Sequence, residues 1–230
     1  MAAPNEITVI QLLRLIGTPE APAIVDISID PDFAEDPFLI PGSFRHPHTD
    51  LPGLIARLDD RPCVVTCQRG IKLSQGAVAW LRSDGHVAEY LQGGMYAWRD
   101  VKNAPRIPAA SIPDPVGKGT LWVTRHRPKI DRIACPWLIR RFVDPVARFL
   151  FVSPTEVPGV ADRYGATPFD VEGVFWSHRG PLCTFDTMLD EFGLRTEALD
   201  RLSKVVRGAD TNAHDLAPEA AGLLALSVGL

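Results

Sequence analysis

Short hydrophobic runs separated by polar turns mark the first half of the chain. Residues 63–66 are an uninterrupted apolar or β-branched run, and residues 23–27 are apolar except for Asp26, as expected for buried strands. Residues 7–16 predict a short strand that runs into a helix, closed by Gly17 and Pro19. We expect further helices at 51–58, 75–82 and 96–101, a strand at 87–91, and an acidic surface loop at 30–37.

Strands that alternate with helices predict an α/β domain, with a parallel sheet flanked by helices. The central strand is expected at 63–66, and Ser74 is a plausible cap for the helix that follows it. Ligands of such sheets bind at the carboxyl ends of the strands, where Cys67 lies.

Proline and glycine then interrupt the pattern. Residues 102–119 contain a Pro-rich stretch that predicts a semi-rigid linker, so we divide the chain into domains 1–104 and 120–230 joined by linker 105–119. The second domain is expected to be α/β or mainly α. Its strands are predicted at 120–124, 148–152 and 167–175, and its helices at 133–143, 184–192, 196–207 and 217–226.

Composition narrows the class of protein. The 230 residues are 46% hydrophobic and 23% charged, as in globular proteins, and the net charge of −4 argues against nucleic-acid binding. We expect no membrane span and no signal peptide at residues 1–6. The four cysteines have neither metal-type nor disulfide-scaffold spacing, which favours a reducing cytoplasm.

Cys67 is the strongest candidate for chemistry. A thiol between a strand end and a helix start faces the positive end of the helix dipole and a curl of backbone N–H groups. Arg69 and Lys72 add positive charge nearby, so the setting favours the nucleophilic thiolate. Cys63, four residues earlier, is expected to pack in the core.

Five blocks in order carry a resemblance to rhodanese-type sulfurtransferases over about residues 5–101. They are Ile24-Val25-Asp26-Ile27, Leu39-Ile40-Pro41-Gly42-Ser43, the loop that begins Cys67-Gln68-Arg69-Gly70, Trp80-Leu81-Arg82-Ser83-Asp84-Gly85-His86, and Leu91-Gln92-Gly93-Gly94-Met95-Tyr96-Ala97-Trp98. One departure is Ser28, where the family often has arginine two residues after the strand aspartate.

The resemblance implies that Cys67 takes a sulfur atom from thiosulfate or a persulfide and passes it to a thiol or cyanide. The implied partners are therefore a small sulfur donor and a thiol acceptor, with no cofactor required for the transfer. It also implies that the backbone of the active-site loop cradles the transferring sulfur; the loop residues are Gln68, Arg69, Gly70, Ile71, Lys72 and Leu73.

Residues 120–230 resemble the C-terminal domain of ChrB chromate-resistance proteins. The carrying residues are Trp122-Val123-Thr124-Arg125, Arg127 through Phe142, Pro168-Phe169-Asp170, Cys183-Thr184-Phe185-Asp186 and Val206-Arg207-Gly208-Ala209-Asp210-Thr211. The resemblance implies a link to chromate resistance. ChrB regulators normally carry a different N-terminal half, so their DNA-binding role is not carried over.

Two groups in this second domain are candidate ligand sites. The basic residues Arg125, Arg127, Lys129 and Arg132 suit a tetrahedral oxyanion such as chromate, or they form internal salt bridges on a solvated face. Asp170, His178 and Asp186 are candidate ligands for iron or manganese; Cys183, Asp210 and His214 are further options. Cys135, at a helix start, has either a lowered thiol pKa or a packing role.

Two functions therefore remain open. The first is a cytoplasmic sulfurtransferase connected with chromate resistance or sulfur oxyanions. The alternative is an oxyanion- or metal-binding sensor in which the rhodanese-like module is not catalytic and Cys67 responds by redox or persulfide chemistry.

Overall fold

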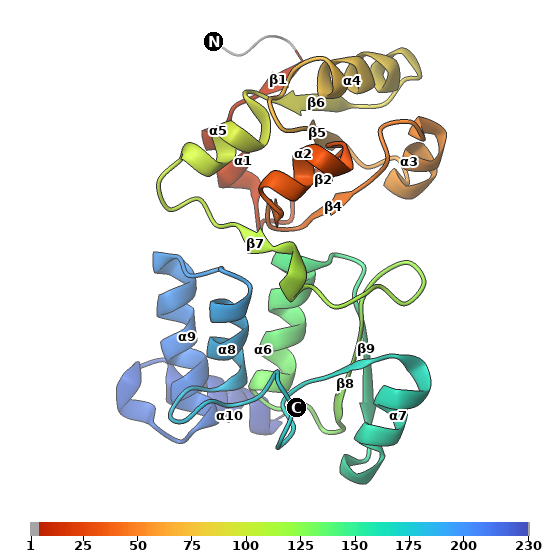
Figure 1. The fold of residues 1–230 in the computed structure, drawn as a ribbon. Helices are drawn as coiled ribbons and strands as arrows, with labels where there is room; N and C mark the ends of the chain where they lie inside the picture. Colours follow the sequence, from red (N-terminus) through yellow and green to blue (C-terminus); the bar gives the residue numbers. More distant parts are fainter. Residues whose placement is uncertain (1–4, 230) are drawn as a thin grey trace. The chain divides into compact units, whose positions relative to one another are not determined.

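In the computed structural model, which describes residues 5–229, the chain forms two units, residues 1–109 and 110–230 (Figure 1). Most of the segment on which the expected absence of a signal peptide rests lies outside the described residues. Among residues 5–229, no helix has the length and apolar character needed to cross a bilayer.

A five-stranded parallel sheet forms the centre of the first unit, which confirms the predicted fold. The strand order is β1 (Glu6–Ile7), β6 (Ala88–Leu91), β5 (Cys63–Thr66), β2 (Ala23–Asp26) and β4 (Ser43–Arg45). The two apolar runs lie side by side in register, since Val25 pairs with Val65. Because β5 is the central strand, the loop that follows it has a strand on either side.

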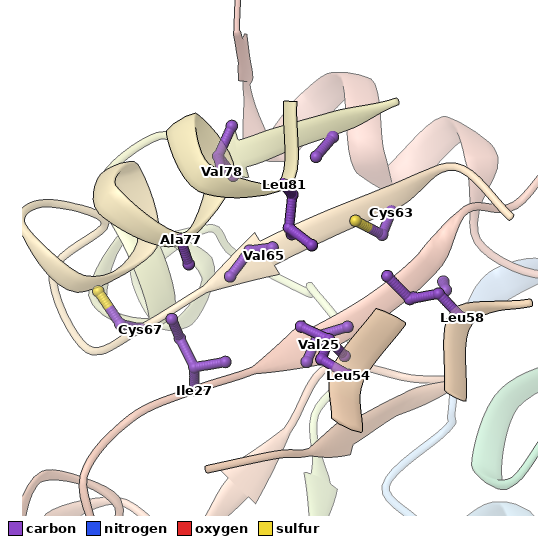
Figure 2. Close-up of a cluster of buried hydrophobic side chains, with 12 residues drawn as sticks. Val25, Ile27, Leu54, Leu58, Cys63, Val65, Cys67, Ala77, Val78 and Leu81 are labelled. Atoms are coloured by element: carbon purple, nitrogen blue, oxygen red, sulfur yellow. The ribbon is translucent and has the colours of Figure 1, made fainter. Parts of the chain in front are cut away.

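Helices cover both faces of this sheet. Side chains alternate along a strand, so Val25 and Val65 face α3 (Leu51–Leu58) and α4 (Leu73–Ser83), as Figure 2 shows. The neighbouring positions, such as Val64, face α1 (Val9–Leu15) and α5 (Gly94–Asp100). Burial on both faces explains why neither run shows a polar alternation.

The acidic segment after β2 is a helix, so the predicted surface loop at 30–37 was wrong. α2 spans Asp30–Glu35 and is followed by β3 (Phe38–Leu39). Pro31 lies in the first turn of α2, where its missing N–H costs nothing, and Asp30 and Asp32 lie near the positive end of the helix. Acidic residues and proline here indicate a helix start rather than a loop.

The segment predicted as a linker has structure at its beginning. β7 (Ile107–Pro108) pairs antiparallel with β3, and Arg106 forms an ion pair with Asp36. A 3-10 turn, η1 (Ala109–Ser111), follows. These contacts hold residues 106–108 against the first unit.

The second unit is α/β, built on a three-stranded parallel sheet in the order β10 (Thr167–Pro168), β8 (Leu121–Arg125), β9 (Arg148–Val152). One face packs on α7 (Val157–Tyr164) through Val123 and Val157. On β8, Trp122 is fully buried with its ring edge against Trp176. The third strand is shorter than predicted, because after Pro168 the pairing with β8 continues only through the hydrogen bond from the Phe169 N–H to the Val123 carbonyl oxygen.

The remaining helices of this unit pack together beside the sheet. They are α6 (Asp131–Leu138), α8 (Thr184–Glu191), α9 (Glu197–Asp210) and α10 (Ala220–Gly229), with short turns η3 (Pro154–Glu156) and η4 (His214–Leu216). The helix predicted at 133–143 begins earlier and widens into a π-helical turn, η2 (Ile139–Val143). Pro136 inside α6 removes one i→i−4 hydrogen bond just before this change.

Candidate functional site

Cys67 lies one residue beyond the carboxyl end of β5, between strand and helix as predicted. It is on the same face of the sheet as Val65, and it lies at the end of the core near Ala77 of α4 (Figure 2). The residue is 5% exposed. Its Sγ atom donates to the carbonyl oxygen of Ile71 at 3.4 Å and to Oγ of Ser74 at 3.3 Å.

Ser74 is not the helix cap that the sequence suggested. α4 begins at Leu73, one residue before Ser74, and Lys72 is the N-cap residue with no side-chain hydrogen bond. Ser74 is instead fully buried in the first turn, with its hydroxyl turned toward the thiol. The residue that looked like a cap is therefore a direct partner of Cys67.

The backbone between Cys67 and α4 curls through two left-handed residues. Gly70 has φ 67° and Lys72 has φ 41°. Within the part of the chain that the structure describes, no hydrogen bond uses the N–H groups of residues 68–72. A curl of free N–H groups of this kind suits an anion.

Contacts with α5 fix the loop in place. The N–H groups of Met95 and Tyr96 donate to the carbonyl oxygens of Cys67 and Gln68, each at 3.0 Å. Gly70 and Gly94 touch so closely that a Cβ atom on Gly94 would lie 2.3 Å from the nitrogen of Gly70. The glycines of the closing motif therefore allow this approach.

The surroundings of the loop carry both signs of charge. Arg69 and Lys72 are exposed, as a role in attracting an anionic donor requires. On the other side, Glu35 of α2 accepts hydrogen bonds from Gln68 Nε2 at 2.8 Å and from the Tyr96 hydroxyl at 3.3 Å. α2 is thus tied to the loop, a feature that sequence reasoning missed because it assigned no helix there.

Cys63, the first residue of β5, packs in the core of the first unit, as predicted. It is buried, and desolvation raises the pKa of its thiol to about 11. At neutral pH it is therefore protonated and shielded, which leaves Cys67 as the candidate nucleophile of this unit.

In the second unit, the predicted basic cluster is divided. Arg132 Nη1 donates to Asp170 at 2.8 Å, and Arg125 lies 3.5 Å from the same carboxylate. Arg127 and Lys129 are exposed. Half of the predicted oxyanion residues thus form internal salt bridges, which was the other interpretation of their charge.

Acidic side chains from separate elements meet around His178. Its Nε2 atom lies 3.4 Å from Asp131, 3.4 Å from Asp170 and 3.2 Å from Asp210. The hydrogen bond to Asp131 and the nearby carboxylates raise the pKa of His178 to about 8. Burial and the charges of Asp131 and Asp170 raise the pKa of Asp210 to about 6.

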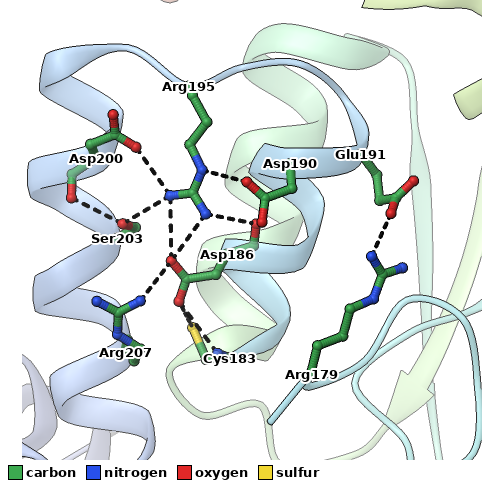
Figure 3. Close-up of polar contacts among 9 residues, drawn as sticks. All are labelled: Arg179, Cys183, Asp186, Asp190, Glu191, Arg195, Asp200, Ser203 and Arg207. Atoms are coloured by element: carbon green, nitrogen blue, oxygen red, sulfur yellow. Dashed lines mark hydrogen bonds and ion pairs between the residues drawn. The ribbon is translucent and has the colours of Figure 1, made fainter. Parts of the chain in front are cut away.

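Of the three predicted metal ligands, Asp170 and His178 lie together and Asp186 does not. Asp186 of α8 binds Arg195 and Arg207, as Figure 3 shows, with its Oδ1 atom 3.2 Å from Arg207 Nη1. Its other oxygen accepts from the backbone of Cys183. Asp186 therefore does not converge with Asp170 and His178, because Arg195 and Arg207 hold its carboxylate.

Asp131, which was not among the predicted ligands, lies beside Asp170 and His178 instead. It starts α6, and its Oδ2 atom accepts from the N–H of Thr184 at 2.5 Å. Cys135, one turn further on, is fully buried, and burial together with Asp131 raises its thiol pKa well above the usual range. The packing interpretation of Cys135 holds, and the lowered pKa does not.

A surface hollow of about 570 Å³ adjoins this carboxylate cluster. Its lining includes Arg125, Asp170, Ser177 and His178. The cluster is therefore reachable from solvent on the side of His178.

Comparison with known protein families divides the chain at the same place as the structure does. Residues 8–100 match the family described as "Rhodanese-like domain", and residues 122–230 match "ChrB, C-terminal domain". The first unit is therefore similar to rhodanese-like domains, and the second unit is similar to ChrB C-terminal domains. Protein ChrB of Cupriavidus metallidurans is 36% identical over 145 residues, which cover 57% of this chain and 43% of that protein.

Two solved structures are each similar to less than half of the chain. A rhodanese-like domain protein from Staphylococcus aureus is 27% identical and covers 41% of this chain and 90% of its own, with a TM-score of 0.36. The protein SSP1007 from Staphylococcus saprophyticus is 28% identical and covers 40% of this chain and 89% of its own, with a TM-score of 0.35. The chain spans less than half of the ChrB protein, so the activity of that whole protein is not carried over.

Proposed function

We propose that the first unit is a sulfurtransferase that carries a sulfane sulfur on Cys67, and that this activity belongs to chromate resistance. The observation that carries the proposal is the position of the Cys67 thiol at the end of the central strand. There its Sγ atom lies 3.3 Å from Oγ of Ser74, and the N–H groups of residues 68–72 have no hydrogen-bond partner among the described residues.

Sulfur transfer needs a nucleophile and a place for negative charge. The Cys67 thiolate attacks the outer sulfur of thiosulfate, an S–S bond forms, and the donor S–S bond breaks with its electron pair leaving on sulfite. An acceptor thiolate then attacks the outer sulfur of the Cys67 persulfide and leaves the Cys67 thiolate behind. No net oxidation occurs, so no redox cofactor is required.

The residues around Cys67 suit both half-reactions. Ser74 can turn its O–H toward the thiolate, since its oxygen already lies 3.3 Å from the sulfur. The free N–H groups of the loop can stabilise the anionic persulfide, as an oxyanion hole does. Arg69 and Lys72, both exposed, favour the approach of an anionic donor.

The link to chromate rests on the second unit. Its support is the match of residues 122–230 to the ChrB C-terminal domain and the 36% identity with Protein ChrB.

The test is thiosulfate-dependent sulfur transfer to cyanide or dithiothreitol by the full chain. We expect activity in the wild type, a mass increase of one sulfur atom on Cys67, and loss of both in Cys67→Ser. Cys63→Ala is the matched control and should keep both, because that thiol is buried and protonated. Absence of activity and of persulfide with thiosulfate and with persulfide donors would refute the proposal.

The hollow beside Asp170 and His178 favours a second candidate function, binding of an oxyanion or metal by a sensor. In that case the Cys67→Ser protein would bind its ligand normally while the wild type shows no turnover. The same two proteins therefore distinguish the candidates.

A further inference from the structure

The carboxylates around His178 come together only in the folded second unit. Asp131 begins α6, Asp170 follows β10, His178 lies in the loop before α8, and Asp210 ends α9. Within the described residues, the donor atoms of Asp131, Asp170 and His178 all lie within 4.8 Å of one another. Groups that far apart in the sequence meet at the spacing of ligands that share one cation.

Burial makes this cluster different from an ordinary acidic surface. Asp131 is 0% exposed and Asp170 is 5% exposed. One oxygen of Asp131, Oδ1, has no hydrogen-bond partner in the part of the chain that the structure describes. A fully buried carboxylate oxygen without a partner is costly, because it has lost water and gained nothing in exchange.

The arginines beside the cluster pair with only one of its carboxylates. Arg132 and Arg125 both bind Asp170, through the same oxygen atom. Among the described residues, the cation-forming group that contacts Asp131 and Asp210 is His178, whose side chain is 40% exposed. Asp131 and Asp210 therefore share one imidazole, and a divalent cation beside them would neutralise the negative charge that the imidazole leaves.

The types of donor atom indicate which kind of cation would bind. Two or three carboxylates with one imidazole nitrogen, and no thiolate among the converging atoms, suit Mn²⁺ or Fe²⁺. Cys135 and Cys183 are both fully buried, and neither belongs to the converging set of donor atoms.

We infer that Asp131, Asp170 and His178 bind a divalent cation of the Mn²⁺ or Fe²⁺ type, with Asp210 as a further carboxylate. The cation would approach from the side of His178, where the hollow lined by Arg125 and Ser177 opens. This inference concerns the second unit and does not depend on sulfur transfer by the first.

The test is Mn²⁺ binding by the full chain after treatment with chelator. The signal of free Mn²⁺ in electron paramagnetic resonance is followed as Mn²⁺ is added, and thermal unfolding is measured with and without the ion. We expect one Mn²⁺ per chain and a higher unfolding temperature in its presence.

His178→Gln is the decisive variant, because its partly exposed side chain can change without opening the core. We expect it to weaken Mn²⁺ binding by at least about ten-fold, since even the loss of an outer-shell partner has that effect. His214→Gln is the matched control, because His214 is an exposed histidine of the same unit.

A second variant, Asp210→Asn, keeps the side-chain shape and removes one carboxylate charge. Weaker Mn²⁺ binding in His178→Gln and Asp210→Asn, with wild-type binding in His214→Gln, supports the site. The proposal is overturned if the wild type shows no saturable Mn²⁺ binding, or if all three variants bind Mn²⁺ as tightly as the wild type does.

Discussion

At the scale of single residues, the partner of the Cys67 thiol decides how it can react. Ser74 is fully buried, and its hydroxyl oxygen lies 3.3 Å from the sulfur. A hydroxyl can accept from a thiol and donate to a thiolate, so it serves both protonation states. No other side chain hydrogen-bonds to Cys67 Sγ among the described residues.

We therefore predict that Ser74→Ala slows the reaction of Cys67. A neutral hydrogen bond contributes roughly 1 kcal/mol, which corresponds to about a five-fold slower alkylation by iodoacetamide at pH 7. The measurement is the rate of modification followed by mass spectrometry. Gln75→Ala, one residue further and exposed, is the control. Equal rates in the two variants would show that the hydroxyl has no role.

Asp26, at the end of β2, is a buried carboxyl group that makes the stability of the protein depend on pH. Its Oδ1 atom accepts from the backbone and hydroxyl of Ser28, while Oδ2 has no partner within the described residues. Burial raises the pKa of Asp26 above its ordinary value of 3.8, against the hydrogen bonds from Ser28 and the charge of Arg45. The folded protein therefore holds this proton more tightly than the unfolded chain.

A raised pKa gives a definite sign to the pH dependence. The contribution of Asp26 to the free energy of unfolding is most favourable below pH 3.8 and is lost as pH rises through the folded-state pKa. Asp26→Asn keeps the acceptor for Ser28 without the charge. We predict that this variant is more stable than wild type at pH 7 and that the difference shrinks toward pH 4.

Urea unfolding of both proteins across this pH range measures that difference. A difference that does not change with pH, or a variant less stable than wild type at pH 7, would contradict the assignment of Asp26 as a group with a raised pKa.

At the scale of elements, the active-site loop depends on how closely α5 approaches it. Gly94 begins α5 with φ 60°, and a Cβ atom there would lie 2.1 Å from the carbonyl oxygen of Cys67. The same close approach allows Met95 to donate to that oxygen. A side chain at this position would push helix and loop apart.

We predict that Gly94→Ala destabilises the first unit by more than about 2 kcal/mol, from left-handed strain and the clash together. It should also abolish sulfur transfer, since the loop loses its support. Gly76→Ala is the matched control within α4, where a Cβ atom meets nothing within 4 Å. This second change should stabilise the protein by about 0.5–1 kcal/mol, as glycine in a helix interior does when replaced by alanine. Urea unfolding measures the stability of both variants. A Gly94→Ala protein as stable as the wild type would disprove the steric argument.

At the scale of the whole molecule, the two units share one feature, which is the position of the candidate site relative to the sheet. Each has a parallel sheet, and each candidate site lies where strands end: Cys67 after β5, and Arg125 and Asp170 at and after the ends of β8 and β10. Loops at the carboxyl ends of parallel strands can carry reactive groups because helix starts supply free N–H groups there. The rhodanese-like and ChrB C-terminal matches correspond to these units.

The sequence by itself determined the fold of the first unit and the place of Cys67 between strand and helix. Uninterrupted apolar runs such as residues 63–66 are local signals of strands buried on both faces, and the reactive loop is contiguous in the chain. Such features need no knowledge of distant residues.

Only the tertiary structure decided which polar groups meet. Asp131 was not among the predicted ligands, yet folding places it beside Asp170 and His178, whereas Asp186 is placed beside Arg195 and Arg207. Ser74 likewise looked like a cap until the start of α4 was fixed at Leu73. Charge, hydrogen bonding and burial act through space, so partners distant in sequence follow from packing and not from local pattern.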